Sequence, residues 1–422
     1  MEFGLIGEHL SHSFSKQIHE KIGGYNYELK ELTREELPSF LFKREFKAIN
    51  VTIPYKEAVI PYLDEIDKSA SLIGAVNCII NKEGKLIGYN TDVFGFMELA
   101  ILMNASFENK NVLILGNGGA SKAIKFFASF SRAKNIFIAS RHDEKGTIRY
   151  EDIKNHPEIE ILVNATPNGM YPHNEDKLLF DFDDLPNLEA VIDLIYNPLK
   201  TKLVIEAESR RINAAGGLFM LVVQAFYAIE LFTGQDVDLE IAKRTYQELA
   251  SQSSNIVLIG MPGSGKSTIG NLLRSRLNRK YDDTDELIKE KIGMEIKDYI
   301  SLKGEESFRD IETEVIKEIY KNTGCIISTG GGVVKRKENM HLLMQNGNIF
   351  YIDRDINKLT ISDSRPLSKD RESLEKMYKE RFPLYELYSY HTINNNDDIN
   401  KAIEEIIRWV ERNDEDFGFE RA

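Results

Sequence analysis

The sequence predicts an α/β fold with parallel sheets, and three observations support this. Short apolar runs of strand length alternate with segments whose apolar residues recur at helical spacing. Two of these runs, residues 111–115 and 256–259, lead through glycine-rich turns directly into helices. The chain has 422 residues, which is enough for two or three domains with substantial cores. Strands that alternate with helices in this way build doubly wound parallel sheets.

The composition narrows the class of protein. A net charge of −13 disfavours non-specific nucleic-acid binding. Cys78 and Cys325 lie far apart and form no disulfide framework or zinc spacing, which fits a reducing cytoplasm. The chain starts without a basic leader, and its longest apolar stretch, 218–232, is shorter than the ~20 residues of a membrane span. We expect a cytoplasmic protein that acts on small molecules, without nucleic-acid or membrane partners and with an oligomeric state that the sequence leaves open.

The first hundred residues are expected to contain strands at 3–7, 48–53 and 74–80. Lys56 follows the end of the second of these strands, and Asp92 follows a predicted hairpin. An ammonium and a carboxylate can act as an acid/base pair if the fold brings them together. The alternative is a surface ion pair, which contributes little to stability.

Residues 101–213 are predicted to form a dinucleotide-binding domain. After strand 111–115, a tight turn leads into a helix N-terminus, an arrangement suited to a pyrophosphate. The turn consists of Gly116, Asn117, Gly118, Gly119 and Ala120. The next strand ends at Ser140 and Arg141, with Lys145 nearby, where an NAD enzyme places an acidic residue for the ribose hydroxyls. Because a cation suits a 2′-phosphate, we predict NADP(H) in preference to NAD.

Eight motifs carry a resemblance over residues 1 to about 248. They are H-S-F-S at 12–15, N-V-T-I-P-Y-K at 50–56, G-A-V-N at 74–77, Y-N-T-D at 89–92, G-N-G-G-A at 116–120, N-A-T-P-N-G-M at 164–170, D-L-I-Y-N-P at 193–198 and G-G-L-F-M-L-V-V-Q at 216–224. Together they resemble shikimate dehydrogenase. The resemblance implies that residues 1–100, completed by about 214–248, form a substrate domain.

The same resemblance implies roles for individual residues. It makes Lys56 and Asp92 the catalytic pair. The residues that would hold the substrate's hydroxyls and carboxylate are Ser13, Ser15, Thr52, Asn77, Tyr196 and Gln224.

The second glycine turn, residues 260–268, has the pattern G-x-x-x-x-G-K-S of a phosphate-binding loop. In such a loop Lys266 would reach the β- and γ-phosphates of ATP, and the Ser267 hydroxyl would bind Mg²⁺. The residues predicted to bind ATP here are Gly263, Ser264, Gly265, Lys266, Ser267 and Thr268. The polar residues 249–254 are predicted to be a short flexible linker, and 255–422 a separate P-loop domain with a parallel sheet.

Charged residues beyond this loop suggest a second site. Asp283 and Asp285 can divide the roles of supporting Mg²⁺ and contacting an acceptor hydroxyl, although an acidic helix start is the alternative. Arg309 and Glu312 share a helix face, so the carboxylate can fix the guanidinium. The glycines at 330–332 follow a strand and let the backbone approach a ligand closely.

These segments carry a second resemblance, over about 254–412. Its motifs are G-M-P-G-S-G-K-S-T at 260–268, D-T-D at 283–285, F-R-D-I-E at 308–312, G-G-G at 330–332, R-P-L at 365–367 and R-F-P-L-Y at 381–385. They resemble shikimate kinase. The resemblance implies that Asp283 supports Mg²⁺ and that Asp285 contacts the hydroxyl to be phosphorylated. It also implies that Arg309, Arg381 and the Gly331 backbone hold shikimate, and that Arg365 closes from a lid onto the phosphates.

The two resemblances predict one bifunctional enzyme on the route to chorismate and the aromatic amino acids. It would reduce 3-dehydroshikimate to shikimate with NADPH and then form shikimate 3-phosphate with MgATP. One alternative is an NAD-dependent quinate/shikimate dehydrogenase, which Arg141 disfavours. The other is that one half is a degenerate binding or scaffolding module. It is supported only by departures from the family patterns at Lys16, His142 and a short lid.

Overall fold

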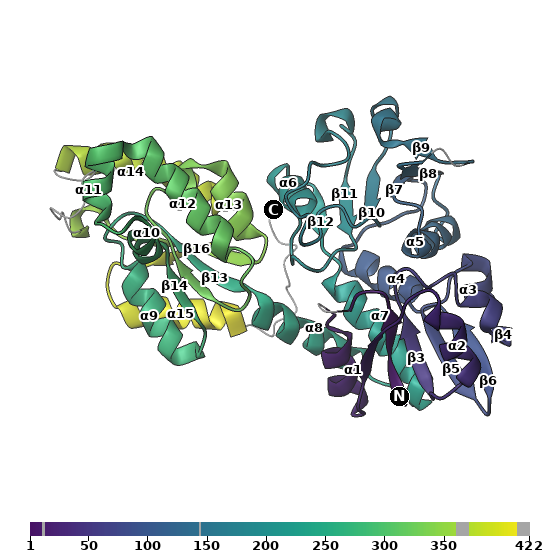
Figure 1. The fold of residues 1–422 in the computed structure, drawn as a ribbon. Coiled ribbons are helices and arrows are strands. Elements are labelled where there is room, and N and C mark those ends of the chain that lie inside the picture. Colours follow the sequence, from purple (N-terminus) through teal and green to yellow (C-terminus); the bar gives the residue numbers. More distant parts are fainter. Residues whose placement is uncertain (11–12, 143–144, 360–370, 412–422) are drawn as a thin grey trace. The chain divides into compact units, whose positions relative to one another are not determined.

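The computed structural model describes residues 1–10, 13–142, 145–359 and 371–411 (Figure 1). The described residues form two compact units, one from Met1 to Glu248 and the other beginning at Leu249. The boundary lies inside helix α8 (Leu239–Ser253), so residues 249–253 are helical and do not form the flexible linker that the sequence predicted. The helix continues because buried Leu249 extends its apolar face and Arg279 donates to the carbonyl oxygens of Ser251 and Ser254.

The first unit begins with a mixed six-stranded sheet in the order β2-β1-β3-β5-β6-β4. Its strands are β1 (Phe3–Gly7), β2 (Glu28–Glu31), β3 (Ala48–Val51), β4 (Glu65–Ile66), β5 (Cys78–Lys82) and β6 (Lys85–Tyr89). Its helices are α1 (Ser15–Gly23), α2 (Glu36–Lys43), α3 (Lys68–Ile73) and α4 (Asp92–Leu102). β5 begins four residues later than the strand predicted at 74–80, because Gly74 ends α3 with a left-handed backbone (φ 73°).

The second sheet of this unit is parallel throughout, in the order β12-β11-β10-β7-β8-β9. Its strands are β7 (Asn111–Leu115), β8 (Asn135–Ser140), β9 (Ile148–Arg149), β10 (Ile161–Asn164), β11 (Ala190–Asp193) and β12 (Asn213–Ala215). Helices α5 (Gly119–Phe130) and α6 (Lys202–Ser209) connect strands of this sheet. The Rossmann-type arrangement predicted from the alternating pattern is therefore confirmed.

Helix α7 (Leu218–Thr233) is the apolar stretch noted in the sequence, and it is a buried helix of the first unit. Its side chains Phe219, Met220 and Val223 pack in one core cluster with Phe96 and Leu99 of α4. This packing brings the C-terminal part of the unit against the helix that begins at Asp92. Among the described residues no helix combines the length and the apolar character needed to cross a bilayer.

The second unit is built on a parallel five-stranded sheet in the order β14-β15-β13-β16-β17. Its strands are β13 (Asn255–Ile259), β14 (Tyr281–Asp283), β15 (Ile326–Ser328), β16 (Gly347–Asp353) and β17 (His391–Asn394). Its helices are α9 (Lys266–Leu277), α10 (Thr284–Ile292), α11 (Ile296–Lys303), α12 (Glu305–Ile319), α13 (Lys337–Met344), α14 (Arg371–Tyr388) and α15 (Ile399–Glu411). The polar segments after β13, β14 and β15 meet at one edge of this sheet because the strands are parallel.

Candidate active sites

The first candidate site lies at one edge of the N-terminal sheet. Lys56 follows β3, Asn77 precedes the antiparallel β5, and Asp92 follows β6, so the strand directions bring all three to the same edge. Lys56 Nζ lies 2.7 Å from Asp92 Oδ2, and both side chains are largely buried, with 14% and 7% of their surface exposed. The pair is therefore not the exposed surface ion pair considered as the alternative.

Asn77 connects the acid/base pair to its neighbours. Its amide nitrogen donates to Asp92 Oδ1 and to Thr91 Oγ1, each at 2.9 Å. The same nitrogen lies 3.3 Å from Gln224 Oε1, and Asn77 Oδ1 accepts from the Thr91 backbone N–H at 2.7 Å. These bonds fix the Asp92 carboxylate in one orientation.

Gly95 allows Gln224 to reach this network. A Cβ atom at Gly95 would lie 2.6 Å from the carbonyl oxygen of Met220 and 3.0 Å from the Cβ of Gln224. Helices α4 and α7 can therefore approach this closely only with glycine at position 95. Neither Gly95 nor Thr91 was expected from the sequence to serve the site, although both lie within four residues of Asp92.

The other predicted substrate residues of this unit lie near the same edge. Ser13 and Ser15 sit at the start of α1, where Ser13 Oγ accepts from the Ser15 backbone N–H at 3.2 Å, and α1 has no side-chain cap bond. The ring of Phe14, between them, lies 5.9 Å from the ring of Tyr196. Thr52 directly follows β3. Burial of the Tyr196 side chain raises the pKa of its hydroxyl group. The segment around Phe14 and the loop that contains Tyr196 are distant in sequence but close in space, and both carry hydroxyl groups.

The dinucleotide turn lies next to the acid/base pair. Gly116 has a left-handed backbone (φ 99°), and a Cβ there would lie 3.0 Å from Thr166 Cγ2. A Cβ at Gly119, the first residue of α5, would lie 3.1 Å from Lys56 Cβ. At Gly118 it would meet no atom of the described residues within 4 Å, so they leave this side of the turn open. The helix N-terminus and open glycine backbone fit a pyrophosphate, with Lys56 beside them.

Asp193, at the end of β11, connects the end of β10 to the start of α6. It is fully buried and accepts hydrogen bonds from Asn164 Nδ2 at 2.9 Å and from Thr201 Oγ1 at 2.6 Å. Burial raises its pKa to about 7, against the lowering effect of Thr201 and its other hydrogen-bond donors. This aspartate stands in one of the sequence motifs, but the motif alone gave it no role.

The predicted 2′-phosphate cations lie beyond β8. Ser140 is the last residue of this strand, and its hydroxyl donates to the His142 carbonyl oxygen at 2.6 Å. Arg141 and Lys145 are both exposed. Arg141 is close enough to Tyr150 to lower the pKa of that phenol, although burial raises it more. An exposed cation at this strand end suits a phosphate on the adenosine ribose.

In the second unit, the phosphate-binding loop joins β13 to α9. Gly260, Gly263 and Gly265 have positive φ angles of 145°, 82° and 101°. Lys266 Nζ is buried and donates to the carbonyl oxygens of Gly260 at 2.8 Å and Met261 at 3.0 Å. The Ser264 hydroxyl is buried and has no hydrogen-bond partner in the described part of the chain. An unsatisfied buried hydroxyl and a buried ammonium in a loop of left-handed glycines fit a polyphosphate.

Ser267 and Asp283 form the predicted metal side of this loop. Ser267 Oγ donates to Asp283 Oδ2 at 2.8 Å, and the Tyr281 hydroxyl donates to the same oxygen at 2.9 Å. Asp283 Oδ1 accepts from the Asp285 backbone N–H at 3.0 Å, which starts α10. A hydroxyl and a carboxylate in contact beside a phosphate loop provide the oxygen ligands that Mg²⁺ prefers. Thr268 follows within α9.

Asp285 lies close to the glycines that follow β15. A Cβ at Gly330 would lie 2.8 Å from Asp285 Oδ1 and 3.0 Å from Glu312 Oε1. Burial raises the pKa of Asp285 and the Asp283 carboxylate raises it further, whereas Lys266, Lys289 and Arg309 oppose this. A carboxylate with a raised pKa beside the phosphate loop suits proton acceptance from a hydroxyl.

Arg309 and Arg381 both lie close enough to Glu312 to lower the pKa of that carboxyl, although burial raises it more. Arg309 Nη1 donates to the fully buried Glu312 at 2.9 Å. Arg381, from α14, is 3% exposed. Among the residues that the structure describes, Arg309 Nε, Arg381 Nε and Glu312 Oε1 are all buried without a hydrogen-bond partner. Because buried polar groups are normally paired, three unsatisfied groups in one cluster indicate a place for a polar ligand.

Two further residues support the second site and were missed. The Tyr385 hydroxyl donates to the Gly331 carbonyl oxygen, and Asn395 Nδ2 donates to the Ser264 carbonyl oxygen at 2.7 Å. Tyr385 stands in the motif R-F-P-L-Y, which alone gave it no role, whereas Asn395 stands at no recognisable spacing from Ser264. Arg365, predicted to close onto the phosphates, lies outside the described residues.

Comparison with known proteins agrees with both units. Residues 5–79 match the model of the shikimate dehydrogenase substrate binding domain, and residues 262–411 match that of shikimate kinase. The chain is 37% identical over 265 residues to "Shikimate dehydrogenase (NADP(+))" of Clostridium perfringens, covering 58% of this chain and 97% of that protein. The chain belongs to the shikimate dehydrogenase family. It carries in addition a shikimate kinase domain, so the predicted fusion is confirmed.

Solved structures show the same relationship for the first unit. Shikimate dehydrogenase 1 of Peptoclostridium difficile is 37% identical with a TM-score of 0.55, covering 59% of this chain and 98% of that chain. Shikimate 5-dehydrogenase of Thermus thermophilus, solved with NADP(H) and shikimate, is 28% identical with a TM-score of 0.53 and covers 59% of this chain and 99% of that chain. Both matches span essentially the whole of a dehydrogenase.

Proposed function

We propose that the first unit reduces 3-dehydroshikimate to shikimate with NADPH, and that the second transfers a phosphoryl group from MgATP to shikimate. This proposal rests on one observation. A single chain contains a complete shikimate dehydrogenase together with a domain of the shikimate kinase family, whose substrate is the product of the dehydrogenase. The two reactions would be consecutive steps toward chorismate and the aromatic amino acids.

In the first reaction, NADPH supplies a hydride to the ring carbonyl when it is bound. Lys56 would donate a proton to the carbonyl oxygen, and Asp92 would orient the ammonium through the 2.7 Å contact. Asn77 holds the other oxygen of Asp92, so the carboxylate cannot rotate away. The hydroxyls of Ser13, Ser15, Thr52 and Tyr196, with Asn77 and Gln224, would hold the substrate's carboxylate and ring hydroxyls.

Cofactor choice would depend on the strand end after β8. Arg141 and Lys145 would pair with the 2′-phosphate, and Ser140 would contribute its hydroxyl. The turn from Gly116 through Ala120 would hold the pyrophosphate against the N-terminus of α5.

In the second reaction, Mg²⁺ held through Ser267 and Asp283 would neutralise charge on the ATP phosphates. Asp285 would accept the proton of the attacking hydroxyl, consistent with its raised pKa. Arg309, Arg381 and the Gly331 backbone would fix the shikimate carboxylate and hydroxyls. Arg365, which lies outside the described residues, would close from a lid onto the phosphates. Such catalysis is largely positioning and charge stabilisation.

We also infer small-molecule substrates, no nucleic-acid or membrane partner and a cytoplasmic location. The net charge of −13 and two buried free cysteines support this.

One reaction tests both activities in order. The purified chain receives 3-dehydroshikimate and NADPH, and MgATP is added later, while NADPH and ADP are followed together. We expect NADPH to fall at once and ADP to appear only after ATP is added. Loss of NADPH without ADP, even with shikimate supplied, would contradict the kinase assignment and favour a degenerate second unit. ADP formation from shikimate without NADPH oxidation would contradict the dehydrogenase assignment.

A further inference from the structure

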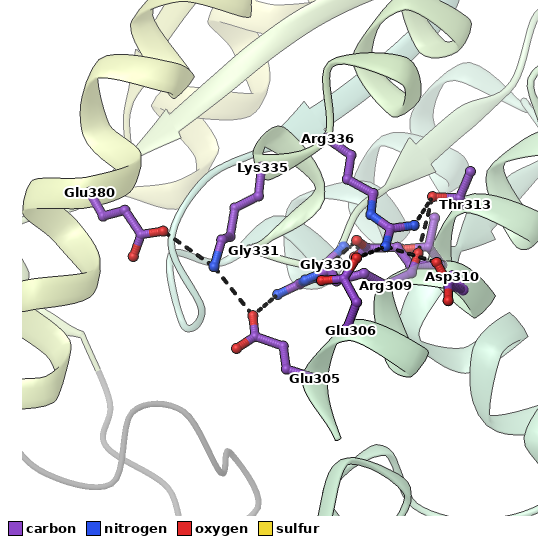
Figure 2. Close-up of polar contacts among 12 residues, drawn as sticks. Glu305, Glu306, Arg309, Asp310, Thr313, Gly330, Gly331, Lys335, Arg336 and Glu380 are labelled. Atoms are coloured by element: carbon purple, nitrogen blue, oxygen red, sulfur yellow. Dashed lines mark hydrogen bonds and ion pairs between the residues drawn. The ribbon is translucent and has the colours of Figure 1, made fainter. Parts of the chain in front are cut away.

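Glu305, the first residue of α12, lies between Arg309 and Lys335, and its role rests on the proposed function of the second unit. Glu305 Oε1 accepts from Arg309 Nη2 at 3.2 Å. The same oxygen lies 3.4 Å from Lys335 Nζ, and Lys335 Nζ lies 3.2 Å from Glu380 Oε1 (Figure 2). Lys335 ends the short helix η4 (Val333–Lys335), directly after the glycine segment, and Glu380 immediately precedes Arg381.

A ligand and Glu305 therefore compete for one nitrogen of the Arg309 guanidinium, Nη2. A carboxylate binds a guanidinium best through two parallel N–H groups, and Nε and Nη2 offer such a pair on one side. Arg309 Nε is buried without a partner among the described residues, and Nη2 already binds Glu305. Nη1 is committed to Glu312, which is fully buried. A substrate carboxylate on the Nε side would therefore share Nη2 with the Glu305 carboxylate, and the two like charges would repel each other.

Glu305 differs from Glu312 in its freedom to move. The Glu305 side chain is 35% exposed, whereas that of Glu312 is 0% exposed. Lys335 and Arg309 together hold the pKa of Glu305 below its usual value although burial opposes them, so the group is an anion in the pH range of activity. Lys335, itself 32% exposed, can retain the Glu305 carboxylate without help from Arg309.

The neighbouring Arg336 has different partners, so contact with the carboxylate that also binds Arg309 is specific to Lys335. Arg336 points to the other side, where it donates to Thr313 Oγ1 at 3.1 Å and pairs with Asp310 at 2.8 Å and with Glu306 (Figure 2). The Thr313 hydroxyl also donates to the backbone carbonyl oxygen of Arg309, and this bond does not involve the Arg309 guanidinium. Arg336 therefore fastens α12, whereas Lys335 shares a carboxylate with the substrate-binding arginine.

We propose that Glu305 competes with the substrate carboxylate for Arg309, and that Lys335 takes over Glu305 when the substrate binds. Both are positioning residues, since they act on the substrate through Arg309. Removing Lys335 strengthens the hold of Glu305 on Arg309 and weakens shikimate binding. Removing the charge of Glu305 ends the competition and makes Lys335 irrelevant to binding.

Calorimetric titration of shikimate into the full chain without ATP tests this with Glu305→Gln, Lys335→Met and the double variant. Because the first unit binds shikimate as its product, the titrations are fitted to two sites, and the Kd compared is that of the second unit. For one partly exposed charge contact we expect Lys335→Met to raise Kd about twofold to fivefold. Glu305→Gln should leave Kd unchanged or lower it, and the double variant should match Glu305→Gln. Lys335→Arg should restore wild-type binding. If Glu305→Gln weakens binding as much as Lys335→Met, or the two losses add, the residues only brace α12 and the proposal is wrong.

Two controls distinguish this exchange from a general effect of charge or of helix stability. Lys317→Met removes another lysine–glutamate pair, with Glu338, that joins α12 to α13 at 2.6 Å, and it should not change Kd. Shikimate methyl ester carries no charge to compete with Glu305, so all variants should bind it equally; unequal binding would contradict the exchange. If the wild-type chain does not phosphorylate shikimate, the proposed function of the second unit fails. If it does so while Lys335→Met leaves the Kd of the second unit unchanged, only the exchange fails.

Discussion

The two candidate sites differ in how their buried polar groups are satisfied. In the first, Lys56, Asp92, Asn77, Thr91 and Gln224 bond to one another. In the second, Ser264 Oγ, Arg309 Nε, Arg381 Nε and Glu312 Oε1 have no partner among the residues that the structure describes. Within these residues the first site is assembled before its ligand arrives, whereas the second holds buried groups that a polar ligand can satisfy. Ligand binding should therefore stabilise the second unit more strongly.

The largest expected effect is at Lys56. Lys56→Ala removes the proton donor while the rest of the network stays paired, so kcat for dehydroshikimate reduction should fall about 10²- to 10⁴-fold. Substrate KM should change far less. Steady-state kinetics with Lys85→Met, an exposed lysine paired with Glu65, provide the control. Near-normal turnover would remove Lys56 from the chemistry.

A comparable effect is expected at Asp285 in the second unit. Asp285→Asn cannot accept the hydroxyl proton, so phosphorylation should fall about 10²- to 10⁴-fold. ATP should still bind, because the phosphate loop is unchanged, and this can be checked by titration of a non-hydrolysable ATP analogue. Asp298→Asn, at an exposed position on α11, is the matched control. Retained phosphorylation would refute the assignment.

A smaller effect is expected from Arg141→Asp, which tests cofactor choice. A charge-assisted contact to phosphate contributes about 1.5–3 kcal/mol, so KM for NADPH should rise roughly tenfold or more. KM for NADH should not rise, because NADH lacks the 2′-phosphate. Arg132→Asp changes an arginine that is 83% exposed and precedes β8 at the opposite end of that strand, and it should leave both values unchanged. Equal losses for both cofactors would contradict the role of Arg141.

The last prediction concerns pH and Asp193, and its effect is on stability and not on activity. Its pKa is raised to about 7 in the folded chain from 3.8, so the folded state binds the proton more tightly than the unfolded state. The stability it contributes is full below about pH 4 and is lost as pH rises to about 7, with a slope of at most about 1.4 kcal/mol per pH unit. Asp193→Asn removes this titration. Unfolding midpoints of the first unit at pH 5 to 8 should decline less steeply for the variant, and parallel curves would show that Asp193 does not titrate here.

The sequence predicted those parts of the fold and sites that leave a local pattern. The glycine turns at 116–120 and 260–268 stand between a strand and a helix, and their placement could be predicted from a few residues. Lys56 and Asp92 were paired correctly because each follows a strand end. What these residues do in catalysis remains a prediction.

The rest depends on contacts between distant residues. Gly95 matters because α7 passes over it, and Asn395 matters because β17 ends beside the phosphate loop, 131 residues from Ser264. Spacing gives no sign of either contact. The linker prediction was wrong about flexibility for a similar reason. Residues 251–253 are polar, but Arg279 satisfies the carbonyl groups at the helix end.

The central claim is that one chain carries two separate catalytic sites for consecutive reactions. Mixing the full-length Lys56→Ala and Asp285→Asn variants tests it most directly, with 3-dehydroshikimate, NADPH and MgATP present and shikimate 3-phosphate measured. Each variant alone should form almost no product, the first because it makes no shikimate and the second because it cannot phosphorylate it. The mixture should form product at a rate that rises with either variant. Product from one variant alone, or none from the mixture, would contradict the account.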